Sequence, residues 1–207
     1  MNLEYRVNAL EKLGALLTAI SEDKSWEGFD TGVTEDEYNA LAEMTKTVRV
    51  FNGWFTEKQV KNSLGAWGNQ LTSHNLSKWL ENYNLNHDNS EKVIGIIMAG
   101  NIPLVGFHDF VCCYVAGFKS KIKLSSDDDK LFPALLNVLN HFDDTVKRRV
   151  EIVFTKLKDI DGIIATGSNN TSRYFEQYFG KYPNIIRKSR TSVAVITGEE
   201  SDEELAG

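Results

Sequence analysis

The feature that most constrains the fold is a change of pattern near residue 90, after which short apolar runs alternate with helical segments. Six runs have the length of a strand: Val93–Met98, Lys121–Leu124, Glu151–Phe154, Gly162–Ala165, Asn184–Ile186 and Ser192–Ile196. Helices are expected between them: about Leu104–Ala116, Ser125–His141, and from Ser168 to Phe179, with Gly180 as a typical helix end. Strands that are apolar on both faces and alternate with helices indicate a doubly wound parallel sheet, an α/β fold.

Residues 1–90 show the longer period of helices instead. Apolar side chains recur there at spacings of three and four: Leu3, Val7, Leu10, Leu13, Leu17 and Ile20. Thr34 and Glu37 have the spacing of a capping box that opens a helix through Met44, and Thr56 opens another toward Leu64. We therefore expect a helical leader over 1–90 that packs on a second region over 91–207.

Charge and composition exclude several classes of protein. A net charge of −6 does not attract nucleic acid or anionic lipid. No run approaches the ~20 apolar residues of a membrane helix. The first residues also lack the basic and then apolar layout of a signal peptide, so a cytoplasmic protein is expected. The only two cysteines, Cys112 and Cys113, are adjacent, which argues against a disulfide framework and against a metal site.

The polar residues that follow three of the predicted strands are the candidates for a site, because open parallel sheets bind ligands at the carboxyl ends of their strands. Asn101 follows the first strand, and Lys123, Ser125, Ser126 and Asp127 follow the second. The fourth strand ends in Thr166, Gly167 and Ser168, a turn whose backbone amides could face a diphosphate at a helix start. Each group also has a structural interpretation, in which Asn101 and the Ser-Ser-Asp turn merely cap the next helix.

Taken in order, these turns resemble the series W-N-F-P, A-x-G-N, L-K-P-S-E and F-T-G-S of the aldehyde dehydrogenase superfamily. Three segments are most similar to the acyl-CoA reductase family, typified by the fatty-acid reductase of bacterial bioluminescence: Met98–Pro103, Ala165–Thr171 and Arg187–Val195. The resemblance covers about residues 90–200 and implies a cofactor domain of the Rossmann type. Residues 1–90 would correspond to the family's helical leader.

The resemblance also implies roles for single residues. Asn101 would be catalytic, donating a hydrogen bond to the thiohemiacetal oxyanion, a kind of interaction that typically contributes ~3 kcal/mol. Lys123 would contact the adenosine ribose with Ser125, Ser126 and Asp127 around it, and Thr166, Gly167 and Ser168 would lie against the diphosphate and nicotinamide. The family preference implies NADPH rather than NADH, although a carboxylate at Asp127 would repel a 2′-phosphate.

The resemblance implies reduction of an acyl-CoA or acyl-protein thioester to an aldehyde through a cysteine-bound acyl group. Hydrolytic relatives carry a general-base glutamate where this chain has Ile185–Arg190, which favours the reductive branch. Nothing here matches the nucleophilic cysteine, so the chain is expected to stop before the catalytic domain and to be inactive alone. A homo-oligomer or a partner acyl-transfer enzyme is expected. A nucleotide-binding or regulatory module without catalysis, and an acyl-phosphate reductase, remain alternatives.

Several other conspicuous residues are expected to be structural. Cys112 and Cys113 lie mid-helix among apolar residues, where thiols are unreactive. The side chains of His108 and Asp109 should point about 100° apart on a helix, so we do not expect them to pair. The tryptophans, including Trp54, are expected to anchor the core.

Overall fold

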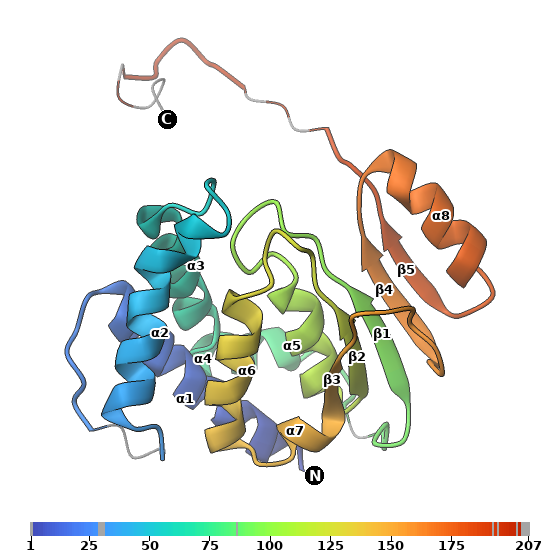
Figure 1. Ribbon diagram of the computed structural model, residues 1–207, viewed down its shortest axis with the longest axis horizontal. Helices are drawn as coiled ribbons and strands as arrows, with labels where there is room; N and C mark the ends of the chain where they lie inside the picture. The colour runs from blue at the N-terminus through green and yellow to red at the C-terminus, as the bar shows by residue number, and fades with distance from the viewer. Residues whose placement is uncertain are drawn as a thin grey trace.

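The computed structural model describes residues 2–28, 32–85, 87–191, 193, 195–201 and 203. Five strands form one sheet (Figure 1): β1 (Val93–Ile97), β2 (Lys119–Lys123), β3 (Val150–Ile152), β4 (Gly162–Thr166) and β5 (Asn184–Arg187). The strand order is β3-β2-β1-β4-β5, and every neighbouring pair is parallel. The predicted α/β fold with a parallel sheet is therefore confirmed.

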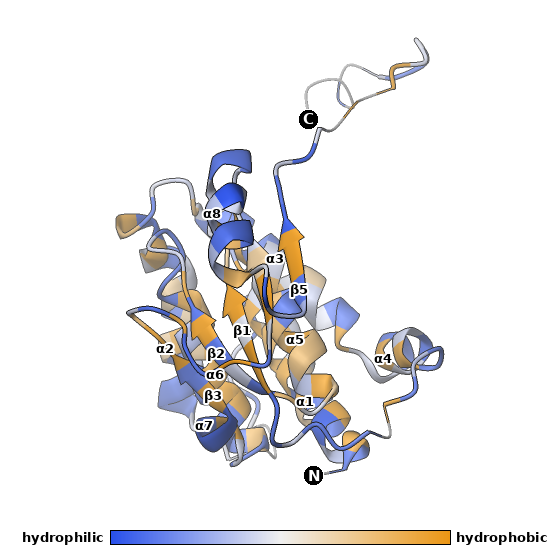
Figure 2. Ribbon diagram, turned by 90° about the vertical axis from the view of Figure 1, so that its right-hand side faces the viewer, coloured by the Kyte–Doolittle hydropathy of each residue, from blue (hydrophilic) through white to orange (hydrophobic). Residues whose placement is uncertain are grey.

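Helices cover both faces of the sheet. Helices α5 (Phe107–Val115) and α6 (Leu131–Phe142) lie on one face, with the short α7 (Val146–Arg149) beneath them, and α8 (Asn169–Phe179) lies on the other (Figure 1). Strand β1 is apolar along its length (Figure 2). Its Ile96 belongs to the large core under α5 and α6, whereas Ile97 packs in a smaller cluster under α8. Because both faces of β1 are covered, apolar and polar side chains do not alternate along it.

The N-terminal segment is helical, as predicted. It contains α1 (Leu3–Ser21), α2 (Glu35–Thr47), the 3-10 turn η1 (Val48–Val50), α3 (Glu57–Gln70) and α4 (Ser73–Leu80). Complete capping boxes open α2 and α3, at Thr34 with Glu37 and at Thr56 with Gln59. Helix α1 contacts α5 and α6, so its buried stripe continues the core that covers the sheet.

Two helices begin later than their sequence predicts. Helix α5 starts at Phe107 rather than near Leu104, because Leu104 has a φ of +60°, outside the helical region. Helix α6 starts at Leu131 rather than at Ser125, and no side chain caps it. Pro133 is its third residue, and proline is tolerated in the first helical turn but not in a helix interior. The expectation that Ser125–Asp127 cap this helix is therefore wrong.

The predicted last strand over Ser192–Ile196 is also not formed by its described residues. Ser192 and Ala194 lie outside the described residues, and Val193, Val195 and Ile196 belong to no strand. The side chains of Val193 and Val195 are 85% and 83% exposed, whereas both faces of this sheet are covered at its centre. Strand propensity reflects a fit to neighbouring strands, which a local pattern cannot guarantee.

The connection from β3 to β4, residues 153–161, contains no helix. Leu157 and Ile160 from this connection pack in the smaller apolar cluster with Ile163 and Ala165 of β4. A full helix would normally cover the sheet at this point. Its replacement by a thin loop leaves open space between the loop and α8.

Candidate functional site

The strand order brings the three predicted turns to one edge of the sheet. Ile97 of β1 is in register with Lys123 of β2 on one side and with Ala165 of β4 on the other. Thr166, the next residue of β4, is in register with Arg187 at the end of β5. The strand order reverses between β1 and β4, since β2 and β3 extend the sheet on one side of β1 while β4 and β5 extend it on the other. Doubly wound sheets leave a crevice for ligands at such a point.

The loop after β1 carries Asn101 and is tightly held. A Cβ added to Gly100 would lie 2.6 Å from both Cβ and Oγ of Ser125, so only glycine allows this approach to the loop after β2. Ser63 Oγ donates to the carbonyl oxygen of Pro103 at 2.8 Å, and Leu104 N donates to Asp128 Oδ2 at 2.8 Å. Contacts from two other segments therefore fix the loop.

Asn101 itself is exposed, and within the described part of the chain its side chain makes no hydrogen bond. The residue that precedes α5 is Gly106, which provides no side-chain cap. Asn101 therefore does not cap the following helix, which removes the structural alternative for this residue. An exposed amide on a fixed loop is available to donate a hydrogen bond to a ligand.

Asp128, which the sequence did not single out, joins the loops after β1 and β2. Its carboxyl is 7% exposed, and while Oδ2 accepts from Leu104 N, the buried Oδ1 has no partner among the described residues. Burial raises the pKa of Asp128 to about 6, with a smaller contribution from Asp129 and against the effect of the Leu104 hydrogen bond. No local pattern separates Asp128 from its neighbours Asp127 and Asp129.

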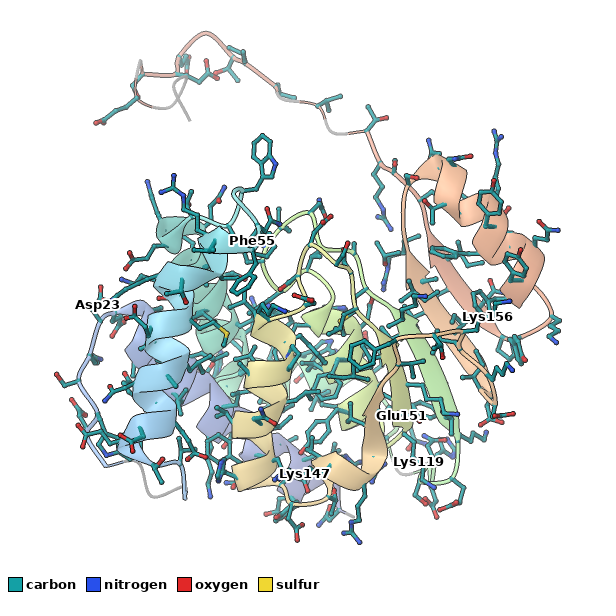
Figure 3. All side chains as sticks on the ribbon, viewed as in Figure 1. Asp23, Phe55, Lys119, Lys147, Glu151 and Lys156 are labelled. Carbon is teal, nitrogen blue, oxygen red and sulfur yellow. The ribbon has the colours of Figure 1, made fainter. Side chains whose placement is uncertain are left out.

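Lys123 lines a pocket of about 670 Å³ that lies between the 153–161 loop and α8. Its Nζ donates to the carbonyl oxygen of Thr155 at 3.2 Å. We call this the Lys123 pocket, and its walls also contain aromatic and basic side chains: Lys156, Lys158, Tyr174, Phe175, Tyr178, Phe179, Lys181 and Tyr182. Asp159 and four lysines line it, which gives it a positive balance. Figure 3 labels Lys156 beside α8.

Sequence reasoning missed the aromatic wall of this pocket, although a signal for it was present. Tyr174, Phe175, Tyr178 and Phe179 recur at spacings of three and four, which places them on one face of α8. The lysines from the 153–161 loop had no comparable pattern. They come to the pocket only because this connection crosses the sheet without a helix.

The other predicted residues after β2 lie outside this pocket. Ser125 Oγ accepts from Asp127 N at 3.2 Å, which closes a local turn. Ser126 and Asp127 are exposed, and the Asp127 carbonyl oxygen accepts from Asn52 Nδ2 at 2.9 Å. The structure thus separates Lys123, which points into the pocket, from the polar turn that follows it.

The turn after β4 leads directly into α8. Ser168 is the N-cap of this helix, and its hydroxyl accepts from Thr171 N at 3.2 Å. A Cβ added to Gly167 would lie 3.0 Å from the Phe175 ring, which explains the glycine. The amides at the start of α8 carry the positive end of the helix dipole at the carboxyl edge of the sheet.

Thr166 faces the α5 side of the sheet, where it lies beside a partly buried ion pair between Arg187 and Asp109. Arg187 Nη1 lies 2.6 Å and 2.7 Å from the two carboxylate oxygens of Asp109 and 3.5 Å from Thr166 Oγ1. Burial alone would raise the pKa of Asp109, but His108 and Arg187 together lower it below its ordinary value. His108 Nδ1 lies 3.7 Å from Asp109, so the expectation that the two do not pair is wrong.

The two neighbouring cysteines, Cys112 and Cys113, differ in burial. Burial raises the pKa of Cys113 to about 12, which agrees with a structural role. Cys112 is only half-buried, and its Sγ lies 3.8 Å from both ring nitrogens of His108. Trp54 is 82% exposed rather than a core anchor, because it lies in the loop between η1 and α3.

The described residues contain no group of three or more His, Cys, Asp or Glu side chains arranged to hold a metal ion. None of the helices over these residues is both long and apolar enough to cross a membrane.

Comparison with known proteins assigns no family to this chain. No protein-family model matches the chain, and no curated protein matches it. Among solved structures, the fold is similar to that of an NAD-dependent benzaldehyde dehydrogenase from Corynebacterium glutamicum, with a TM-score of 0.46 and 12% sequence identity. That similarity covers 91% of this chain but 42% of the dehydrogenase, so the chain spans less than half the length of the protein it matches.

Proposed function

We propose that this chain binds NADPH along the carboxyl edge of its sheet, as the cofactor-binding portion of a reductase that converts acyl thioesters to aldehydes. The observation that carries the proposal is the Lys123 pocket, which opens beside the point where the strand order reverses. Residues 91–207 would form the cofactor-binding region, and residues 1–90 the helical leader that packs on it.

The adenosine end of the cofactor fits the Lys123 pocket by its chemistry. Aromatic side chains such as Tyr174 and Tyr178 offer faces for stacking an adenine ring. Lys123 retains two N–H groups beyond the one it gives to Thr155, and these can reach a ribose. Lys156 and Lys181 provide positive charge for a 2′-phosphate, whereas the carboxylate of Asp127 does not line the pocket. This balance favours NADPH over NADH.

The diphosphate and nicotinamide would lie across the β1 and β4 turns. Thr166, Gly167 and Ser168 precede α8, whose first amides can hold an anion. Asn101 is an exposed donor on a fixed loop, suited to stabilise an oxyanion that forms on the acyl group. NADPH supplies a hydride when bound. The thioester part of this proposal rests on Asn101 and on the family resemblance of the three turns.

A ligand titration tests the nucleotide assignment. Saturating NADPH, at about 100 times its Kd, adds about 2.7 kcal/mol to the free energy of unfolding. For a chain of this size the melting temperature should rise by roughly 5–10 °C. Lys123→Ala should reduce the rise, whereas Lys121→Ala, on the same face of β2 but outside the pocket, should not. Asn101→Ala should also leave binding unchanged.

The 2′-phosphate assignment needs its own comparison. Replacing Lys156 and Lys181 with alanine should weaken NADPH binding and leave NADH binding nearly unchanged, because NADH lacks the 2′-phosphate. An equal loss for both cofactors would contradict the preference for NADPH. If neither cofactor shifts the melting temperature of the folded chain, the nucleotide assignment itself is wrong.

A further inference from the structure

A second polar pocket lies at the opposite edge of the sheet. Its volume is about 330 Å³, and residues that lie one to three positions before β1, β2 and β3 line it: Ser90, Gly117 and Arg149. The start of α1 and the loop before β1 complete the walls with Asn2, Leu3, Arg6, Leu85, His87, Asp88 and Asn89. The pocket lies near the amino ends of the strands, toward the edge where Figure 3 labels Lys119 and Lys147. We call it the Arg149 pocket.

Two guanidinium groups converge in this pocket at the end of α5. Arg6 donates from Nε and Nη2 to the carbonyl oxygen of Val115, at 3.2 Å and 3.0 Å. Arg149 Nη2 donates to the carbonyl oxygen of Gly117. Gly117 has a φ of +82°, a backbone conformation that favours glycine, and Arg6 Nη2 lies within ordinary contact distance of this turn.

These contacts leave a positive balance in the pocket. Arg6 is 5% exposed, and burial, followed by the nearby charge of Arg149, lowers its pKa. The nearby Tyr114 and Asp143 act in the opposite direction and raise the pKa of Arg6. Asp88 is the one acidic residue of the wall, and its carboxylate accepts from Ser90 N at 3.0 Å. Among the described residues of the wall, two guanidinium groups thus stand with one carboxylate, and a bound anion would reduce the repulsion between the two cations.

The chemistry of the wall defines the ligand. A guanidinium presents several N–H groups in a planar fork that matches phosphate and carboxylate oxygens. Arg149 uses one of these groups for Gly117. Polar side chains of Asn2, His87 and Ser90 surround the remaining space. We propose that the Arg149 pocket binds a small oxyanion, a phosphate or carboxylate group, at a site separate from the Lys123 pocket.

Melting curves with inorganic phosphate and with malonate, at constant ionic strength set with sodium chloride, test this proposal. The melting temperature of the full chain should rise saturably with at least one of these anions. Arg149→Gln should abolish that rise. Arg148→Gln, which removes the same charge from the exposed neighbouring position on α7, should retain it.

The test also separates this site from the nucleotide site. Lys123→Ala should keep the full response to the anion, and Arg149→Gln should keep its response to NADPH. If Arg149→Gln fails to fold, Arg149→Lys keeps the charge without the fork and should weaken anion binding as measured by calorimetry. No saturable response in the unaltered chain, or an equal response in both arginine variants, would overturn the proposal.

Discussion

At the scale of single residues, the buried carboxyl of Asp128 makes stability depend on pH. Its pKa in the folded chain is about 6, above the ordinary 3.8, so folding favours the protonated form. The stabilisation that comes from protonated Asp128 is fully present below about pH 4, and it is lost as the pH rises toward and through 6. A difference of about 2 pKa units corresponds to roughly 3 kcal/mol.

The neutral isostere should remove this dependence. Asp128→Asn should be more stable than the unaltered chain above pH 6, by up to roughly 3 kcal/mol, and the difference should shrink toward pH 4. Urea unfolding at a series of pH values measures it. Asp127→Asn, which makes the same change at an exposed neighbouring position, is the matched control. A constant difference for Asp128→Asn across the range would contradict the raised pKa.

At the scale of elements, the contact between α1 and α3 depends on two glycines. A Cβ on Gly68 would lie 2.2 Å from Thr18 Oγ1 and 3.0 Å from the carbonyl oxygen of Gly14. A Cβ on Gly14 would lie 2.7 Å from Leu71 Cβ. The backbones of the two helices therefore approach closely only because these positions have no side chain.

Gly68→Ala should destabilise the chain by about 1–3 kcal/mol, because the added methyl group would clash with Thr18 Oγ1 and crowd the backbone of α1 behind it. Gly65→Ala, three residues earlier on α3, is the matched control. Its Cβ would meet mainly the side chain of Ser21, at 3.1 Å, and alanine is the better helix former by ~1 kcal/mol. Urea midpoints should therefore fall for the first variant and stay equal or rise for the second; the reverse order would refute this account of the helix contact.

At the scale of the whole molecule, one core joins the helical leader to the sheet. The Trp67 and Phe107 rings meet edge to face at 4.7 Å, and buried side chains of α1 belong to the same cluster as those of α5 and α6. A shared core predicts that the two regions unfold together even though their sequence patterns differ.

Two local probes can test this cooperativity. All four tryptophans lie within residues 1–90, so their fluorescence reports on the leader. In a Cys112→Ser background, reaction of the buried Cys113 thiol reports on α5. The urea midpoints from the two probes should coincide. Separate midpoints would mean that the leader and the sheet unfold as independent units.

The sequence by itself determined the elements that depend on near neighbours. The capping boxes at Thr34 and Thr56, the end of α8 at Gly180 and the apolar strands of a parallel sheet all follow from spacings of a few residues. It also placed Asn101, Lys123 and Thr166 at the ends of three strands. Their proposed roles in binding remain predictions from the resemblance.

Only the tertiary structure decided which of these residues share a pocket. Lys123, Thr155 and Tyr178 are far apart in the chain and meet because the β3 to β4 connection lacks a helix. The burial of Asp128 and the exposure of Trp54 were decided in the same way. Local patterns report which side of an element is apolar, whereas a pocket, a shifted pKa or an unpaired strand depends on what distant segments place beside it.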